Sequence, residues 1–221
     1  MKETMPIKGK KGRLEVICGS MFSGKSEELI RRLHRAEFAK QNVITFKPGI
    51  DTRKSLAHIV SHNGKERRAY PISNSHESLQ YILELADDSI DVVGIDEVQF
   101  LPTEIITVIM ELIDHGKQVI VAGLDLDFRS EPFGVIPTLL ALADEIVKLK
   151  AICVICAQEA QHSQRLINGK PASYDDPIIL IGAEELYEAR CRDCFVTNKP
   201  REKQNELFAT SPKTDFKQTV L

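Results

Sequence analysis

The sequence predicts an α/β fold built on a mainly parallel sheet with a small appended domain. Apolar runs of strand length alternate along the chain with segments whose apolar residues recur at helical spacing. Several of these runs are apolar on both faces, which is typical of parallel strands covered by helices on both sides. A glycine-rich loop joins the first run to the first helical segment, as in nucleotide-binding α/β proteins.

The elements follow in order from the apolar spacing. The first strand is expected at 13–18 and the first helix at 27–40. The later strands are expected at 42–48, 57–61, 91–100, 117–128 and 145–152. The later helices are expected at 77–86, 104–116 and 137–143. Gly116 at the end of the 104–116 segment is a normal helix stop signal.

Composition sets the domain plan and excludes some functions. The chain has 221 residues with a net charge of −3, so it lacks the general basic surface of a broad nucleic-acid binder. No apolar run reaches the length of a membrane span and no signal peptide is visible, so we expect a cytoplasmic protein. We expect a flexible lead at 1–12, a main α/β domain at 13–150, a cysteine-bearing domain at 151–199 and a disordered tail at 200–221.

The segment GSMFSGKS (19–26) fits the phosphate-binding loop pattern, with Gly19, Gly24, Lys25 and Ser26 at the defining positions. Glycines let backbone N–H groups converge on phosphate oxygens, the lysine reaches the outer phosphates and the hydroxyl helps to hold Mg²⁺. The strand before the loop and the helix after it supply the required setting, and the helix directs its positive dipole end at the anion. We therefore expect a nucleotide phosphate site here.

A pair of acids ends the apolar run within 91–100, which is expected as a strand. Asp96 and Glu97 lie at the carboxyl end of that run, where ligands gather in parallel sheets. Asp96 is placed to bind Mg²⁺, directly or through water. Glu97 could orient water in an ATPase or accept a proton from a hydroxyl group in a kinase. The loop and the acids alone do not choose between these activities.

Four of the five cysteines form two pairs, CVIC (153–156) and CRDC (191–194), which are typical of a closed structural zinc site. Cys18 lies in the first expected strand and is interpreted as a small buried residue. The zinc pairs would anchor the long interval between them, including an extended segment at 177–182 and Tyr187. A zinc-bearing nucleic-acid motor is disfavoured, because acids offset Arg165 and the other basic residues of this region.

The ordered motifs GSMFSGKSEELIRR, FKPGIDTR, IVSHNG, IDEVQF, GLDLDFRSEPFG, CVIC, SQR and IGAEELYEARCRDC span about 12–195. In this order they resemble the cytosolic zinc-containing (type II) thymidine kinases. The resemblance implies a RecA-type nucleotide-binding fold and transfer of phosphate from ATP to the 5′-hydroxyl of thymidine, and of deoxyuridine as well, in pyrimidine salvage. It further implies Mg²⁺, structural Zn²⁺, inhibition by dTTP and a homotetramer.

The resemblance also assigns roles to residues. It makes Glu97 the proton acceptor, places Lys25 on the donor phosphates and places Arg53 near the reacting phosphate. The implied ATP and Mg²⁺ site consists of Gly19, Ser20, Met21, Phe22, Ser23, Gly24, Lys25, Ser26, Asp96 and Gln99. The implied thymidine site consists of Met21, Phe100, Leu124, Phe128, Phe133, Ser163, Ile178, Ile179, Leu180, Ile181, Gly182 and Tyr187. The implied zinc ligands are Cys153, Cys156, Cys191 and Cys194.

Two departures from the family pattern bear on these roles. Asp127 and Glu131 introduce charge into the segment around Phe128, which resembles a flexible lid. Ser163 stands where the animal enzymes have threonine, and the missing methyl is worth at most about 1 kcal/mol of pocket contact. His58 and His62 are interpreted as structural.

A hydrolytic ATPase with a zinc ribbon and a non-catalytic nucleotide sensor remain as alternative functions.

Overall fold

The computed structural model describes residues 11–49, 58–60, 66–179 and 186–199. Its centre is a six-stranded sheet in the order β5-β2-β6-β7-β1-β8, and every adjacent pair is parallel. The strands are β1 (Arg13–Gly19), β2 (Val43–Pro48), β5 (Tyr70–Ile72), β6 (Val92–Ile95), β7 (Gln118–Gly123) and β8 (Glu145–Leu149). Because the strands are parallel, the loops after β1, β6 and β7 meet at one edge of the sheet.

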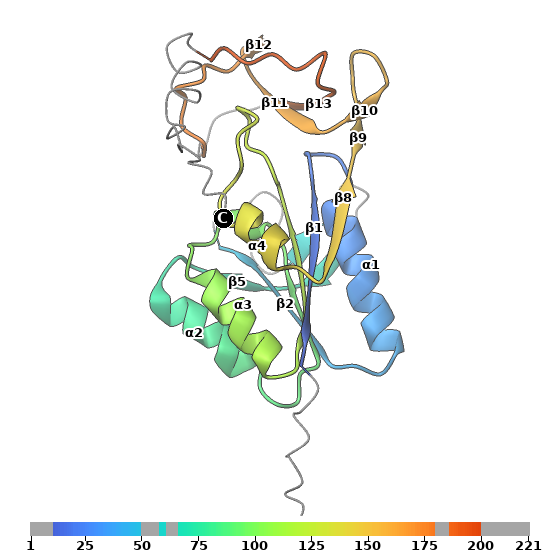
Figure 1. Ribbon diagram of the computed structural model, residues 1–221, viewed down its shortest axis with the longest axis vertical. Helices are drawn as coiled ribbons and strands as arrows, with labels where there is room; N and C mark the ends of the chain where they lie inside the picture. The colour runs from blue at the N-terminus through green and yellow to red at the C-terminus, as the bar shows by residue number, and fades with distance from the viewer. Residues whose placement is uncertain (1–10, 50–57, 61–65, 180–185, 200–221) are drawn as a thin grey trace, which may run out of the picture.

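Helices cover both faces of this sheet, as Figure 1 shows. Helix α1 (Lys25–Phe38) lies on one face, and α2 (His76–Leu85), α3 (Ile105–Asp114) and α4 (Ile136–Leu142) lie on the other. Successive residues of β1 point to opposite faces, so Val16 joins the core beneath α3 and Ile17 joins the core beneath α1. Both side chains are almost fully buried, and each such burial contributes about 1.5–3 kcal/mol.

The parallel α/β class predicted from the sequence is confirmed, but some element bounds were wrong. The strand expected at 91–100 ends at Ile95, and a 3₁₀ turn, η1 (Val98–Phe100), follows it. The chain leaves the strand because Glu97 adopts a left-handed conformation with φ of 49°. The segment at 117–128, expected as a buried strand running into a loop, is a strand as far as Gly123 and a loop beyond it.

A short hairpin packs on the α1 face. The strand expected at 57–61 is β3 (His58–Val60), which pairs in antiparallel fashion with β4 (Glu66–Arg68). Strands β4 and β5 were not predicted from the sequence; Glu66–Arg68 of β4 is charged throughout and lacks the apolar alternation of a strand. Arg67 of β4 donates to Thr45 of β2 at 2.8 Å, which ties the hairpin to the main sheet.

The cysteine-bearing part continues from β8 and forms two small sheets beyond one end of the main sheet (Figure 1). In the first, β9 (Ala151–Ile152) pairs with β10 (Glu159–Ala160). In the second, β11 (His162–Ile167) lies between β12 (Lys170–Pro171) and β13 (Leu186–Arg190). None of the helices in the described ranges is long and apolar enough to cross a membrane.

Candidate active site

The segment after β1 folds as a tight loop into α1. Gly19 has a φ of 143°, and a Cβ atom there would lie 2.2 Å from the carbonyl oxygen of Leu149. Gly24 is the N-cap of α1 and has a φ of 88°, which strains any residue with a side chain. The Lys25 Nζ donates to the carbonyl oxygen of Ser20 at 2.8 Å, so the ammonium folds back over the loop. The loop thus places a cation and the first N–H groups of α1 at one point.

Asp96 lies across from this loop, at the end of β6. It is 4% exposed, and its carboxylate bonds the Ser26 hydroxyl and accepts the Glu97 N–H at 3.0 Å. Burial, together with the nearby Glu97 charge, raises the Asp96 pKa to about 7. A desolvated carboxylate beside a hydroxyl and a second acid is a donor set suited to a hard divalent cation. Ser26 and Asp96 could therefore hold Mg²⁺.

Glu97 is oriented by a buried amide. Gln99 in η1 donates from Nε2 to Oε2 of Glu97 at 2.5 Å, and its Oε1 accepts the N–H of Leu124 at 3.1 Å. Gln99 is 4% exposed, so these bonds form away from water. The side chain therefore connects the acid after β6 to the loop after β7.

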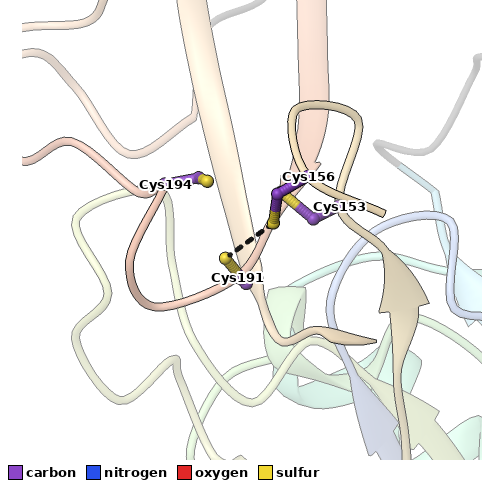
Figure 2. A group of neighbouring side chains, drawn as sticks. All are labelled: Cys153, Cys156, Cys191 and Cys194. Atoms are coloured by element: carbon purple, nitrogen blue, oxygen red, sulfur yellow. Dashed lines mark hydrogen bonds between the residues drawn. The ribbon is translucent and has the colours of Figure 1, made fainter. Parts of the chain in front are cut away.

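The four paired cysteines converge from two separate turns (Figure 2). Their sulfur atoms all lie within 4.8 Å of one another, and those of Cys156 and Cys191 are 3.5 Å apart. Four thiolates at about 2.3 Å from a tetrahedral zinc ion would be about 3.8 Å apart, so the cluster fits this ion. The described residues thus bring together all four predicted ligands, which could hold one zinc ion.

The two turns that carry these cysteines have the same local design. The N–H of Ala157 donates to the carbonyl of Cys153 at 2.9 Å, and the N–H of Phe195 donates to that of Cys191 at 3.0 Å. Burial tends to raise the pKa of Cys153, but backbone N–H donors of Cys191, Cys156 and Ile155 lower it to about 6. Hydrogen bonding with Cys156 instead raises the pKa of Cys194 to about 12, so Cys153 loses its proton before Cys194 and forms the thiolate that binds metal.

The sequence model of the thymidine kinase family matches residues 12–195. The chain belongs to the thymidine kinase family. Membership makes it a kinase, a transferase of phosphoryl groups, and indicates thymidine as the acceptor. The matched range contains the loop after β1, both acids and all four cysteines, so it includes both the α/β part and the cysteine-bearing part.

Thymidine kinases need a site for the nucleoside, and several residues expected there lie near one another. The N–H of Met21 in the phosphate loop donates to the Ser163 hydroxyl of β11 at 2.9 Å. Phe100 and Phe133 pack edge to face, with ring centroids 5.5 Å apart. Leu124 is bonded to Gln99, as described above. These contacts bring the ends of β1, β6, β7 and β11 to the same region.

The loop that carries Phe128 is a tight hairpin in this member of the family. The buried carboxylate of Asp127 accepts the N–H groups of Arg129 at 2.8 Å and Glu131 at 3.0 Å. The acidic residues Asp127 and Glu131 therefore have structural partners. Asp127 folds the loop on itself, whereas Glu131 bonds the Tyr174 hydroxyl and accepts from Lys199 at 3.1 Å.

Sequence reasoning missed the side chains that connect this loop to the small sheets. Ser130 bonds Nδ1 of His162 at 2.8 Å, and Arg165 lies against Phe128. Arg165 belongs to the SQR motif, but its contact partners are remote in sequence. The SQR motif therefore marked Arg165 as part of the family pattern but did not indicate which residues it contacts.

Some predicted residues lie outside the described ranges. These are Arg53, His62, Leu180, Ile181, Gly182, most of the 1–12 lead and the 200–221 tail. Of the expected extended segment at 177–182, the structure describes 177–179, which form no strand. Ile178 and Ile179 are exposed, and Tyr187 is partly buried in β13.

Proposed function

We propose that the chain transfers the γ-phosphate of ATP to the 5′-hydroxyl of thymidine, and also of deoxyuridine, to give the monophosphate in cytoplasmic pyrimidine salvage. The observation that carries this proposal is the meeting of the Lys25 loop, the buried Asp96–Ser26 pair and the Gln99-held Glu97 at one edge of the sheet. Family membership supports thymidine as the acceptor.

The donor phosphates are proposed to lie on the loop from Gly19 to Ser26. Backbone N–H groups at the start of α1 face the phosphate oxygens, and the Lys25 ammonium leaves the Ser20 carbonyl to neutralise the outer phosphates. Ser26 and Asp96 would hold Mg²⁺, which supplies charge neutralisation to the transferring group when bound. We also assign Arg53 to the reacting phosphate, following the resemblance.

The acceptor hydroxyl is proposed to lie at Glu97. Glu97 accepts the 5′-hydroxyl proton while the oxygen forms a bond to the γ-phosphorus and the bond from that phosphorus to the bridging oxygen of ADP breaks. The proton on Glu97 then passes to solvent. Gln99 holds the carboxylate in its reactive orientation throughout. Positioning and charge neutralisation supply most of the rate, because the transition state is loose.

The base is proposed to lie between the Phe128 loop and the part of the chain anchored by the cysteines. The main domain, 13–150, would bind the donor, and the domain at 151–199 would close over thymine through Ile178–Gly182 and Tyr187. Cys153, Cys156, Cys191 and Cys194 could hold a zinc ion, which would anchor the ends of this segment away from the reacting atoms. Inhibition by dTTP and assembly as a homotetramer belong to the same proposal.

Product analysis tests the proposal against its alternatives. The protein is incubated with ATP and Mg²⁺, with and without thymidine, and ADP and thymidine monophosphate are measured. Release of ADP that requires thymidine and equals the monophosphate formed supports the kinase. Thymidine-independent ADP release would indicate an ATPase, and nucleotide binding without turnover would indicate a sensor. A nucleoside panel then compares thymidine with deoxyuridine.

A further inference from the structure

Arg165 of β11 is one of the most deeply buried side chains in the described part of the protein, at 0% exposed. Its guanidinium carbon lies 3.6 Å from the centroid of the Phe128 ring, which is the distance of direct stacking. An arginine is rarely buried to this degree without a specific set of partners. Its position therefore calls for an explanation beyond packing.

The same guanidinium binds the chain that leads into the long interval between the cysteine pairs. Its Nη1 donates to the carbonyl oxygen of Pro177 at 2.7 Å and approaches that of Ile178 at 3.5 Å. The carboxylate of Asp176 lies 3.9 Å from Nη2. Arg165 thus contacts two segments at once, the Phe128 loop through the face of its guanidinium and residues 176–178 through its edge.

This double contact depends on the planar shape of arginine. A guanidinium stacks on an aromatic ring with its face while its N–H groups donate in its own plane. A lysine ammonium carries the same charge but cannot do both from one place. Strand β11 also presents Ser163 two residues earlier, and Ser163 bonds Met21 of the phosphate loop. Ser163 and Arg165, which are alternate residues of β11, therefore contact three separate segments: the phosphate loop, the Phe128 loop and residues 176–178.

We propose that Arg165 is a positioning residue that sets the affinity for the nucleoside base, by fixing the Phe128 ring and residues 176–178 relative to each other. This inference rests on the proposed function, in which Phe128 lies against thymine. Arg165 covers one face of the ring and does not touch the reacting atoms. Its loss leaves the phosphate loop and Glu97 in place and loosens the two walls of the base pocket.

The test is a comparison of Arg165→Lys and Arg165→Met with the wild-type protein. Lysine keeps the charge, and methionine removes it but keeps an unbranched side chain against Phe128. We expect the KM for thymidine to rise roughly 10- to 30-fold, the loss for one buried cation–π contact. The KM for ATP should stay within about threefold, since the donor site is not touched.

Arg32→Lys is the matched control. Arg32 is also an inward-lying arginine, which pairs with Glu15, Glu28 and Glu145 on the main domain. It should change thermal stability without changing the KM for thymidine. In a Phe128→Leu background, Arg165→Lys should add little, because the ring through which it acts is gone. Zinc content and melting temperature are measured for every variant.

The outcomes separate the inference from the function on which it rests. If the wild-type protein does not phosphorylate thymidine, the proposed function fails. If it does, and both Arg165 variants keep the wild-type KM for thymidine, the inference alone fails. Equal loss of ATP and thymidine binding, or loss of zinc, in both variants would also overturn it, because Arg165 would then maintain the fold as a whole. A selective rise in the KM for thymidine, absent in Arg32→Lys, supports it.

Discussion

The hydrogen bond from Gln99 to Glu97 offers a direct test of how the proposed catalytic base is held. The change is Gln99→Leu, which keeps the approximate size of the side chain and removes both its donor and its acceptor. A hydrogen bond to a charged group is worth about 1.5–3 kcal/mol, so we expect kcat to fall about 10- to 150-fold. The KM values for ATP and thymidine should change little if Gln99 acts only through Glu97, whereas a rise in the KM for ATP would support the donor-site role that the family resemblance implies.

Stability must be followed in the same experiment. The substitution leaves the partly buried N–H of Leu124 without its 3.1 Å acceptor, which costs up to about 1–3 kcal/mol of unfolding free energy. Gln118→Leu is the matched control, because Gln118 donates to Glu15 at 2.7 Å at the opposite end of β7. Its kcat should stay normal.

Steady-state kinetics at saturating ATP and thymidine, with melting temperatures for both variants, give the result. Glu97→Gln sets the upper limit, a fall in kcat on the order of 10²- to 10⁴-fold for a general base. A folded Gln99→Leu protein with wild-type kcat would refute the positioning role. An equal loss of kcat in Gln118→Leu would show that the effect comes from lost stability.

Three further changes test the remaining parts of the site. Lys25→Ala should abolish turnover in a protein whose melting temperature is near normal, because the ammonium stabilises charge that moves during transfer, and a normal kcat would contradict the phosphate site. Asp96→Asn should lower Mg²⁺-dependent activity and stabilise the metal-free protein at neutral pH. Because burial raises the Asp96 pKa to about 7, the native carboxyl binds more protons than the unfolded one between about pH 4 and 7. The stability of the wild-type protein relative to Asp96→Asn should therefore fall as pH rises through that window, and parallel pH profiles of melting temperature would refute this. Cys191→Ser should release zinc and weaken thymidine binding before ATP binding, as measured by calorimetry, whereas equal losses would mean that zinc supports the whole fold.

Local patterns predicted the parts of the molecule that local forces determine. The strand–loop–helix around Lys25 and the parallel sheet could be predicted, because the loop motif and apolar spacing are properties of short segments. The end of β6 could not, because the left-handed conformation of Glu97, which turns the chain out of the strand, is not encoded by the spacing of apolar residues. The four cysteines could be grouped from their spacing alone, since zinc constrains ligand number and type.

Contacts between segments that are distant in the chain could not be predicted from the sequence. The stacking of Arg165 on Phe128 requires β11 to lie beside a hairpin that is remote in sequence, and neither segment encodes that neighbour. For the same reason Asp127 was read as an irregular charge in a lid, although it is the acceptor around which the hairpin turns. The resemblance supplied Ser163 as a pocket residue but not its bond to Met21.

The hydrogen bond between the Met21 N–H and the Ser163 hydroxyl has a thermodynamic consequence. The Met21 amide belongs to the phosphate loop, yet it is already engaged by the Ser163 hydroxyl and donates away from the cradle. In the proposed kinase, any displacement of β11 on binding of the base is transmitted to the loop that is assigned to the donor phosphates. The two substrates then bind with a coupling free energy, and linkage requires it to be reciprocal. Whatever factor thymidine applies to the dissociation constant of ATP, ATP applies the same factor to that of thymidine.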